Sequence, residues 1–221
     1  MAARAATRLL ADRARHARQT PEPRPWPEFA EYNCYACHHD LAVGSYRQDQ
    51  QHYGRRHPGT LPWGSWYFTM PRLLLETDET ARLRLLPLLD QLTERMQKPA
   101  PDADRVAQDA ALMADGLGNW LGQQQEKIDG AALLRLVANR ASDGRWLADE
   151  WDRAEQFYLA FCALRRSPQD AGAQRLLDAV SLQLAFPPLS DQDRYDSPAN
   201  YGQSRAKLRE LFEHLGKEFV R

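Results

Sequence analysis

Apolar residues recur at spacings of three and four along most of the chain beyond residue 100. Such a spacing brings the apolar side chains onto one face of an α-helix, which a globular protein buries. We therefore predict an all-α fold, built as a helical bundle or as stacked helix pairs, and no strands, because no stretch alternates between apolar and polar residues. The four stripes are Val106, Ala110, Met113, Leu117 and Trp120; Leu147, Trp151, Ala154, Tyr158 and Phe161; Ala173, Leu177, Val180 and Leu184; and Leu208, Phe212, Leu215 and Phe219.

Prolines and glycines divide the first part of the chain. Alternating prolines within residues 20–32 predict the end of a first helix and an extended linker. Residues 33–66 show no sustained period, so we expect an irregular, Pro/Gly-rich segment that a bound cofactor would order. Pro71 and Pro87 interrupt the leucine runs that follow, and we expect short helices beginning at these prolines rather than one long helix.

The first 20 residues are rich in alanine and arginine, as in a transit peptide, but Leu9 and Leu10 alone do not form the apolar centre of a secretory signal. We favour a solvated amphipathic helix over residues 1–20. The chain has 221 residues, of which 43% are hydrophobic, and a formal net charge of -1. This charge gives no reason to expect nucleic-acid binding, and no apolar run is long enough for a transmembrane segment.

Residues 33–41 read N-C-Y-A-C-H-H-D-L and contain two of the three cysteines. Cys34, Cys37 and His38 have the Cys-x-x-Cys-His spacing at which a c-type haem is attached. In such a site two thiols bond to the porphyrin vinyl groups, and the adjoining histidine binds the iron. The spacing therefore predicts a covalent haem c with His38 as the proximal iron ligand.

A structural zinc ion is the main alternative cofactor. Cys34, Cys37, His52 and His57 have the spacing C-x2-C-x14-H-x4-H, which suits a tetrahedral zinc site. However, a zinc-finger histidine pair lies on a helix, whereas here Gly54 lies between the two histidines and Pro58 directly follows His57, which does not favour a helix. A thioredoxin-like redox pair would need a strand before the motif, where this chain is proline-rich. We therefore favour haem.

The second axial ligand decides whether a haem mainly carries electrons or is open to substrates. We rank His57 first and His52 second, because both lie in a segment long enough to cross the ring and would give a bis-histidine site. Met70 would give histidine–methionine ligation, and His16 could approach from the first helix. His39 could serve only a neighbouring haem, because it directly follows the proximal ligand.

Three further stretches accompany the motif: Y46-R-Q48, G54-R-R-H-P-G59 and W63-G-S-W-Y-F68. Together with residues 33–41 they resemble the last haem-bearing segment and the helical C-terminal part of bacterial multihaem c-type cytochromes. The resemblance is specific over residues 25–70 and looser over the helices beyond.

The resemblance implies haem on Cys34 and Cys37, iron bound by His38, and electron transfer to redox partner proteins or neighbouring haem domains. It also implies a periplasmic or other extracytoplasmic location. This chain has one attachment motif where the family has several, and no export signal is visible. Both departures would follow if it were the C-terminal part of a longer protein.

We thus expect a basic N-terminal helix over residues 1–20, a haem-c-binding segment over 21–70 and a helical domain over 71–221. The expected function is electron transfer, and a catalytic activity is less expected because the chain carries no phosphate loop or nucleophile elbow. The alternative is a helical protein-interaction module with structural zinc.

Aromatic residues flank the motif and would either line the haem or form the core beneath it. The third cysteine, Cys162, lies beside apolar helix positions, and we expect a buried structural thiol unrelated to the site. The aromatic residues are Trp26, Phe29, Tyr32, Tyr35, Trp63, Trp66, Tyr67 and Phe68.

Overall fold

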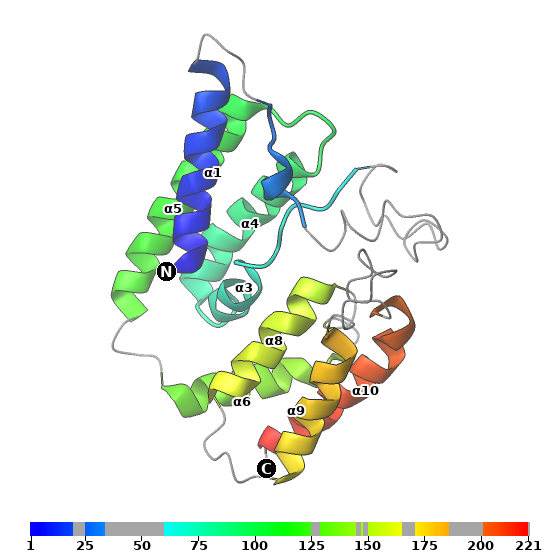
Figure 1. Ribbon diagram of the computed structural model, residues 1–221. Coiled ribbons are helices and arrows are strands. Elements are labelled where there is room, and N and C mark those ends of the chain that lie inside the picture. The colour runs from blue at the N-terminus through cyan, green and yellow to red at the C-terminus, as the bar shows by residue number, and fades with distance from the viewer. Residues whose placement is uncertain are drawn as a thin grey trace. The chain divides into compact units, whose positions relative to one another are not determined.

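The computed structural model describes residues 1–19, 25–33, 60–124, 129–144, 147, 150–164, 171–185 and 201–220. Within these ranges the regular structure is helical apart from one isolated bridge, so the all-α prediction is confirmed (Figure 1). None of the described helices is long and apolar enough to cross a membrane. The helices are α1 (Ala2–Gln19), η1 (Phe29–Glu31, a 3-10 turn), α3 (Thr69–Leu75), α4 (Glu79–Met96), α5 (Ala103–Gln124), α6 (Gly130–Ala141), α8 (Trp151–Leu164), α9 (Ala171–Leu184) and α10 (Tyr201–Val220).

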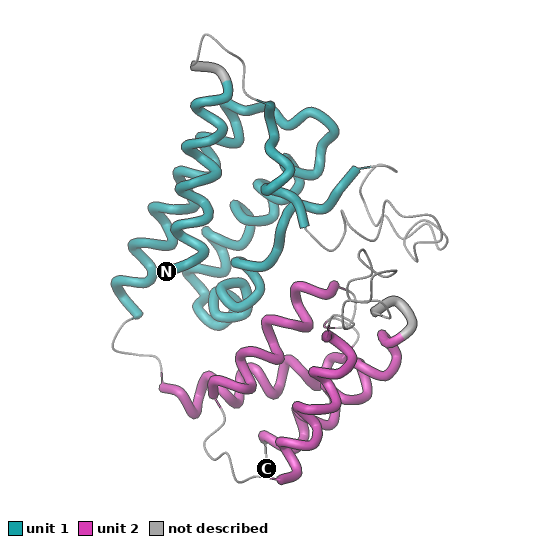
Figure 2. The backbone as a smooth tube through the Cα atoms, in the orientation of Figure 1, with its two compact units in different colours: residues 1–126 teal, residues 127–221 magenta. Residues whose placement is uncertain are grey.

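The chain divides into two compact units, residues 1–126 and residues 127–221 (Figure 2). Unit 1 contains α1, η1, α3, α4 and α5, together with the described ends of the expected haem-binding segment. Unit 2 contains α6, α8, α9 and α10. The helices expected beyond residue 71 are therefore shared between two units.

In unit 1 the most extensive helix contact is between α1 and α5, which lie side by side (Figure 1). The expectation of a solvated first helix is wrong for one face, which is buried through Ala3, Thr7, Leu10, Ala11 and Ala14. Small alanine side chains on both helices let the backbones approach closely. The predicted stripe on α5 is confirmed, because all five of its residues are buried.

The expectation that Pro87 divides two helices is wrong, because α4 continues through it from Glu79 to Met96. Proline removes the hydrogen bond from its own nitrogen to the carbonyl four residues earlier, here that of Leu83. Both Pro87 and Leu83 are exposed, so water can reach that carbonyl. The opposite face of α4 stays apolar on both sides of the proline.

Asp78 joins the start of α4 to the end of α5 in unit 1. Its carboxylate caps α4 by accepting from the backbone N–H of Ala81 at 3.0 Å. The other oxygen accepts from the Trp120 indole at 3.1 Å and from the Gln124 amide at 2.9 Å, both on α5. One carboxylate thereby satisfies donors from the start of α4 and the end of α5.

In unit 2, α6 packs on α8 and α10, and α9 packs on the same two helices. The stripe on α9 is confirmed throughout, and that on α10 at Leu208, Phe212 and Leu215. On α8 the predicted residues Ala154 and Phe161 are fully buried, but Phe157 is fully buried in place of Tyr158, which is half-buried. The predicted α8 face was therefore displaced by one residue at its centre.

Helix α6 was not predicted from the sequence, although a capping residue precedes it. Asp129 accepts hydrogen bonds from the backbone N–H groups of Ala131 and Ala132, as an N-cap residue does. Close packing explains the glycine on the facing helix: a Cβ at Gly216 of α10 would lie 2.6 Å from the Ala138 carbonyl oxygen. The helix pair α6 and α10 therefore requires a glycine at this crossing.

Candidate functional site

The described residues that precede and follow residues 34–59 lie side by side in unit 1. The N–H of Asn33 donates to the Pro62 carbonyl at 2.9 Å, and the N–H of Gly64 donates to the Glu31 carbonyl at 2.9 Å. Between these bonds Tyr32 and Trp63 form an antiparallel bridge. We call residues 31–33 and 62–64 the closing bridge. It brings the chain that enters the Cys/His segment next to the chain that leaves it.

An ion pair fastens the closing bridge to α1. Nη1 of Arg13 donates to Oε1 of Glu31 at 2.6 Å, and Nε of Arg13 lies 3.6 Å from Oε2 of Glu28. The Glu31 side chain is only 9% exposed, so the Arg13 guanidinium, rather than water, is the main partner of this carboxylate. The hydrogen bond to Glu31 raises the pKa of Arg13, which remains a cation.

Aromatic side chains anchor the same region to the core of unit 1. Trp63 and Phe68 are buried, with ring centroids 4.8 Å apart. The Trp26 indole donates to the Pro101 carbonyl at 2.8 Å, which ties the linker before the bridge to the loop before α5. Burial, with a smaller contribution from neighbouring Glu31, raises the pKa of Tyr32.

The flanking aromatic residues do not form one uniform group. Trp63 and Phe68 belong to the hydrophobic core, as one of the two interpretations expected. Phe29 is 84% exposed and Tyr67 is 50% exposed, so these two rings lie at the surface near the closing bridge in sequence. Tyr35 lies outside the described residues.

The predicted cofactor ligands lie in a part of the chain that the structure does not describe. Among the described residues no group of three or more histidine, cysteine, aspartate or glutamate side chains could hold a metal ion. The haem and zinc hypotheses therefore stay predictions. The residues concerned are Cys34, Cys37, His38, His39, His52 and His57.

Two weaker candidates for the distal ligand are described. Met70 is half-buried in α3. His16 lies on the exposed side of α1, where its Nδ1 is 2.8 Å from the Asp12 carbonyl oxygen. Local hydrogen bonding therefore occupies one nitrogen of this ring and leaves Nε2 as the atom that could bind iron.

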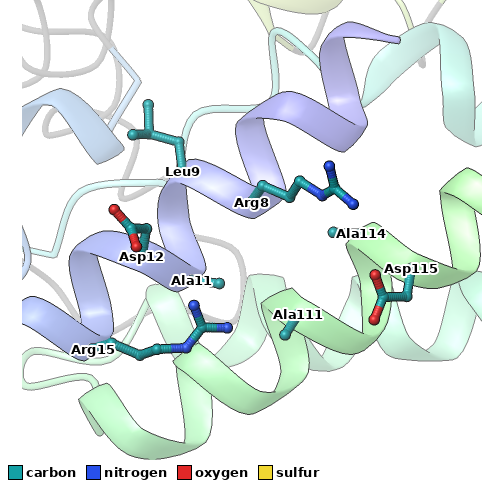
Figure 3. A pocket seen from close by; sticks show the side chains of 8 residues that line it. All are labelled: Arg8, Leu9, Ala11, Asp12, Arg15, Ala111, Ala114 and Asp115. Atoms are coloured by element: carbon teal, nitrogen blue, oxygen red, sulfur yellow. The ribbon is translucent and has the colours of Figure 1, made fainter.

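A shallow hollow between α1 and α5 was not foreseen from the sequence. Figure 3 shows the side chains of Arg8 and Arg15 reaching from α1 towards α5, above alanines of both helices. Two carboxylates, Asp12 and Asp115, balance the two guanidinium groups, so the hollow selects neither anions nor cations. Its lining residues are Arg8, Leu9, Ala11, Asp12, Arg15, Ala111, Ala114 and Asp115.

Cys162 in unit 2 is half-buried rather than buried, which corrects the expected environment of this thiol. Its thiol interacts with the Tyr158 hydroxyl one turn earlier on α8, and this hydroxyl also bonds to Ser181 of α9. The bond to Ser181 lowers the pKa of Tyr158, but burial, the Cys162 thiol and Glu155 outweigh it, so the pKa is raised overall. The thiol thus joins a small polar contact between two helices.

No protein-family model matches this sequence, and no curated protein or solved structure is significantly similar to it.

Proposed function

We propose that this chain is an electron-transfer protein with one c-type haem bonded to Cys34 and Cys37 and with its iron bound by His38. The spacing of these three residues is the observation that carries the proposal. Their chemistry fits the group: two thiols can form two thioether bonds, and an imidazole is a haem-iron ligand. When bound, haem c supplies one-electron exchange at its iron.

The surroundings of the segment support this proposal. A covalently held cofactor needs a chain whose two ends are fixed, because its position otherwise varies with every movement of the loop. The closing bridge provides such an attachment, and the buried rings of Trp63 and Phe68 join it to the core. The residues of unit 1 would thus limit the movement of the haem relative to α1 and α5.

The wider resemblance leads to a proposal about context. We infer that the chain acts beside further haem groups, in the manner of a segment of a multihaem c-type cytochrome, and exchanges electrons with redox proteins outside the cytoplasm. His57 is the first candidate for the distal ligand and His52 the second. Replacing the true ligand by alanine would convert a low-spin haem spectrum to a high-spin one, whereas replacing the other would not.

The decisive experiment is expression of the full chain with an export signal in a host that contains the c-type maturation machinery. The wild type should show haem staining that survives denaturation and a mass increased by one haem. The double variant Cys34→Ala/Cys37→Ala should lose covalent haem, and His38→Ala should alter the iron spectrum. Cys162→Ala is the matched control and should stain like the wild type, because its thiol lies outside the motif.

A colourless wild-type protein with the mass of the bare polypeptide would overturn the proposal. The zinc alternative makes the opposite prediction for the same samples. Purified protein would then contain one zinc ion, and His52→Ala/His57→Ala would remove it. Elemental analysis of both proteins measures this difference, and it favours a helical interaction module if zinc is found.

A further inference from the structure

The Arg13–Glu31 ion pair joins two segments that are otherwise separated by the linker. Arg13 lies in the second turn from the end of α1, and Glu31 begins the closing bridge. The side chains are 28% and 9% exposed, and the bond between Nη1 and Oε1 measures 2.6 Å. A charge-assisted bond of this length with so little solvent contact is among the stronger side-chain interactions.

Glu31 takes part both in this ion pair and in the closing bridge. The carboxylate of Glu31 binds Arg13, while its backbone carbonyl accepts from the N–H of Gly64. Two residues further along, the N–H of Asn33 donates to the Pro62 carbonyl. Any movement of Glu31 away from α1 would therefore disturb both hydrogen bonds of the closing bridge.

The ion pair is also close to the proposed cofactor attachment in the chain itself. Cys34 follows Glu31 by three residues, and three residues span at most about 11 Å even when fully extended. At such a distance a charge in a partly buried site would change the relative stability of the ferric and ferrous states of the proposed haem. Arg13 faces both Glu31 and Glu28, so loss of Arg13 removes a positive charge and loss of Glu31 removes a negative one, and the two losses change the local charge in opposite directions.

We propose that Arg13 and Glu31 are positioning residues: they hold the start of the Cys/His segment on α1 and balance the charge beside its cofactor. The positioning part follows from unit 1 alone. The charge-balancing part rests on the proposed function.

Hydrogen exchange tests the positioning part with or without haem. In Arg13→Gln and in Glu31→Gln, the amides of Asn33 and Gly64 should exchange at least tenfold faster than in the wild type. The double charge reversal Arg13→Glu/Glu31→Arg should restore part of the protection, because it recreates the pair. Unchanged exchange at both amides in both single variants would overturn the proposal.

A second ion pair of unit 1 supplies the matched control. Nε of Arg95 on α4 lies 2.5 Å from Oδ2 of Asp109 on α5, with side chains 20% and 14% exposed. Arg95→Gln thus removes a similar pair that includes no residue of the closing bridge. Its Asn33 and Gly64 amides should keep wild-type exchange, and equal acceleration in this variant would reveal a general loss of stability instead.

In protein that carries haem, the midpoint potential tests the charge-balancing part. Arg13→Gln leaves the Glu31 carboxylate unbalanced and should lower the potential, because negative charge favours ferric iron. Glu31→Gln removes one of the two carboxylates beside the Arg13 guanidinium and should raise it. Mere loosening would shift both variants in the same direction, so shifts of equal sign would overturn this part. Absence of haem from the wild type would refute the proposed function and leave the exchange result to decide the positioning.

Discussion

The described contacts that hold the helices together differ in kind between the two units. In unit 1, polar side chains connect segments that are far apart in sequence: Asp78 binds Trp120, Arg13 binds Glu31, and the Trp26 indole binds a backbone carbonyl. Unit 2 has such contacts too, for example the Trp151 indole that donates to the Leu184 carbonyl at 3.4 Å, but its core also contains large, fully buried aromatic side chains such as Phe157 and Phe212. There the backbones of α6 and α10 approach so closely that only glycine fits at the crossing.

This difference corresponds to what each unit must hold. Helices with apolar stripes can be assembled by burial alone, which has no direction. Irregular chain has no such stripe, and its position must be fixed by directional contacts between specific atoms. Unit 1 contains the residues that flank a segment predicted to be irregular, together with directional contacts that hold these flanking residues, and it is therefore the unit in which polar substitutions should have the larger effects.

Asp78→Ala should give the largest effect and tests whether polar contacts stabilise unit 1. The substitution removes the cap of α4 and leaves the Trp120 indole and the Gln124 amide without this acceptor. We expect a loss of about 2–4 kcal/mol in the free energy of unfolding, from one lost cap and two unpaired donors. Urea unfolding, monitored by hydrogen exchange in α5, measures this loss of free energy.

Asp129→Ala is the matched control in unit 2, because Asp129 caps α6 from an exposed position. A loss of about 1 kcal/mol is expected from the cap alone. Equal losses in the two variants would mean that the contacts with Trp120 and Gln124 contribute nothing, and the comparison between the units would fail.

Gly216→Ala should have an intermediate effect and tests the close crossing in unit 2. The added Cβ would lie 2.6 Å from the Ala138 carbonyl oxygen and 3.0 Å from the Ser142 nitrogen, so the helices must separate. We expect a loss of about 1–3 kcal/mol, as for overpacked cores. The same substitution at Gly122 of α5, where nothing lies within 4 Å, should stabilise by about 0.5–1 kcal/mol. Thermal unfolding of both variants would contradict the assignment if Gly216→Ala were the more stable.

Glu155→Gln should have the smallest effect, visible only in its pH dependence. Burial raises the pKa of Glu155 above its ordinary value of 4.5, so the folded state binds the proton more tightly than the unfolded state. Stability from this group is therefore complete below pH 4.5 and is lost as the pH rises through the higher folded-state pKa. The variant should match the wild type at pH 4 and exceed it at pH 7 in urea midpoint. A difference independent of pH would contradict this reasoning.

The sequence predicted helices best where the apolar stripe is unambiguous. Every residue of the stripe from Val106 to Trp120 is buried, because helical spacing alone decides which side chains share a face. The pattern was less informative for α1, where alanine is compatible with either a buried or an exposed face. At Pro87 the rule for helix interruption was wrong, because it takes no account of whether the freed carbonyl meets water.

The candidate site was predicted only in its chemistry. The spacing of Cys34, Cys37 and His38 can be read directly, whereas the closing bridge cannot, because no local pattern tells that Tyr32 lies opposite Trp63. The ion-pair partner of Glu31 could not be predicted from the sequence either, because Arg13 is 18 positions away and the chain contains many other arginines. Such pairs depend on how α1 packs on α5.

By itself, the sequence determined most of the helical segments, which faces most of them bury, and where two thiols and an imidazole follow one another. These are local properties that depend on neighbours within one or two turns. Only the tertiary structure decided that the stripes assemble into two units, that α1 belongs to the core, and that residues 31–33 and 62–64 meet with Glu31 bonded to Arg13. Those contacts join residues distant in sequence, and their stability comes from packing and hydrogen bonds that exist only when both partners are in place.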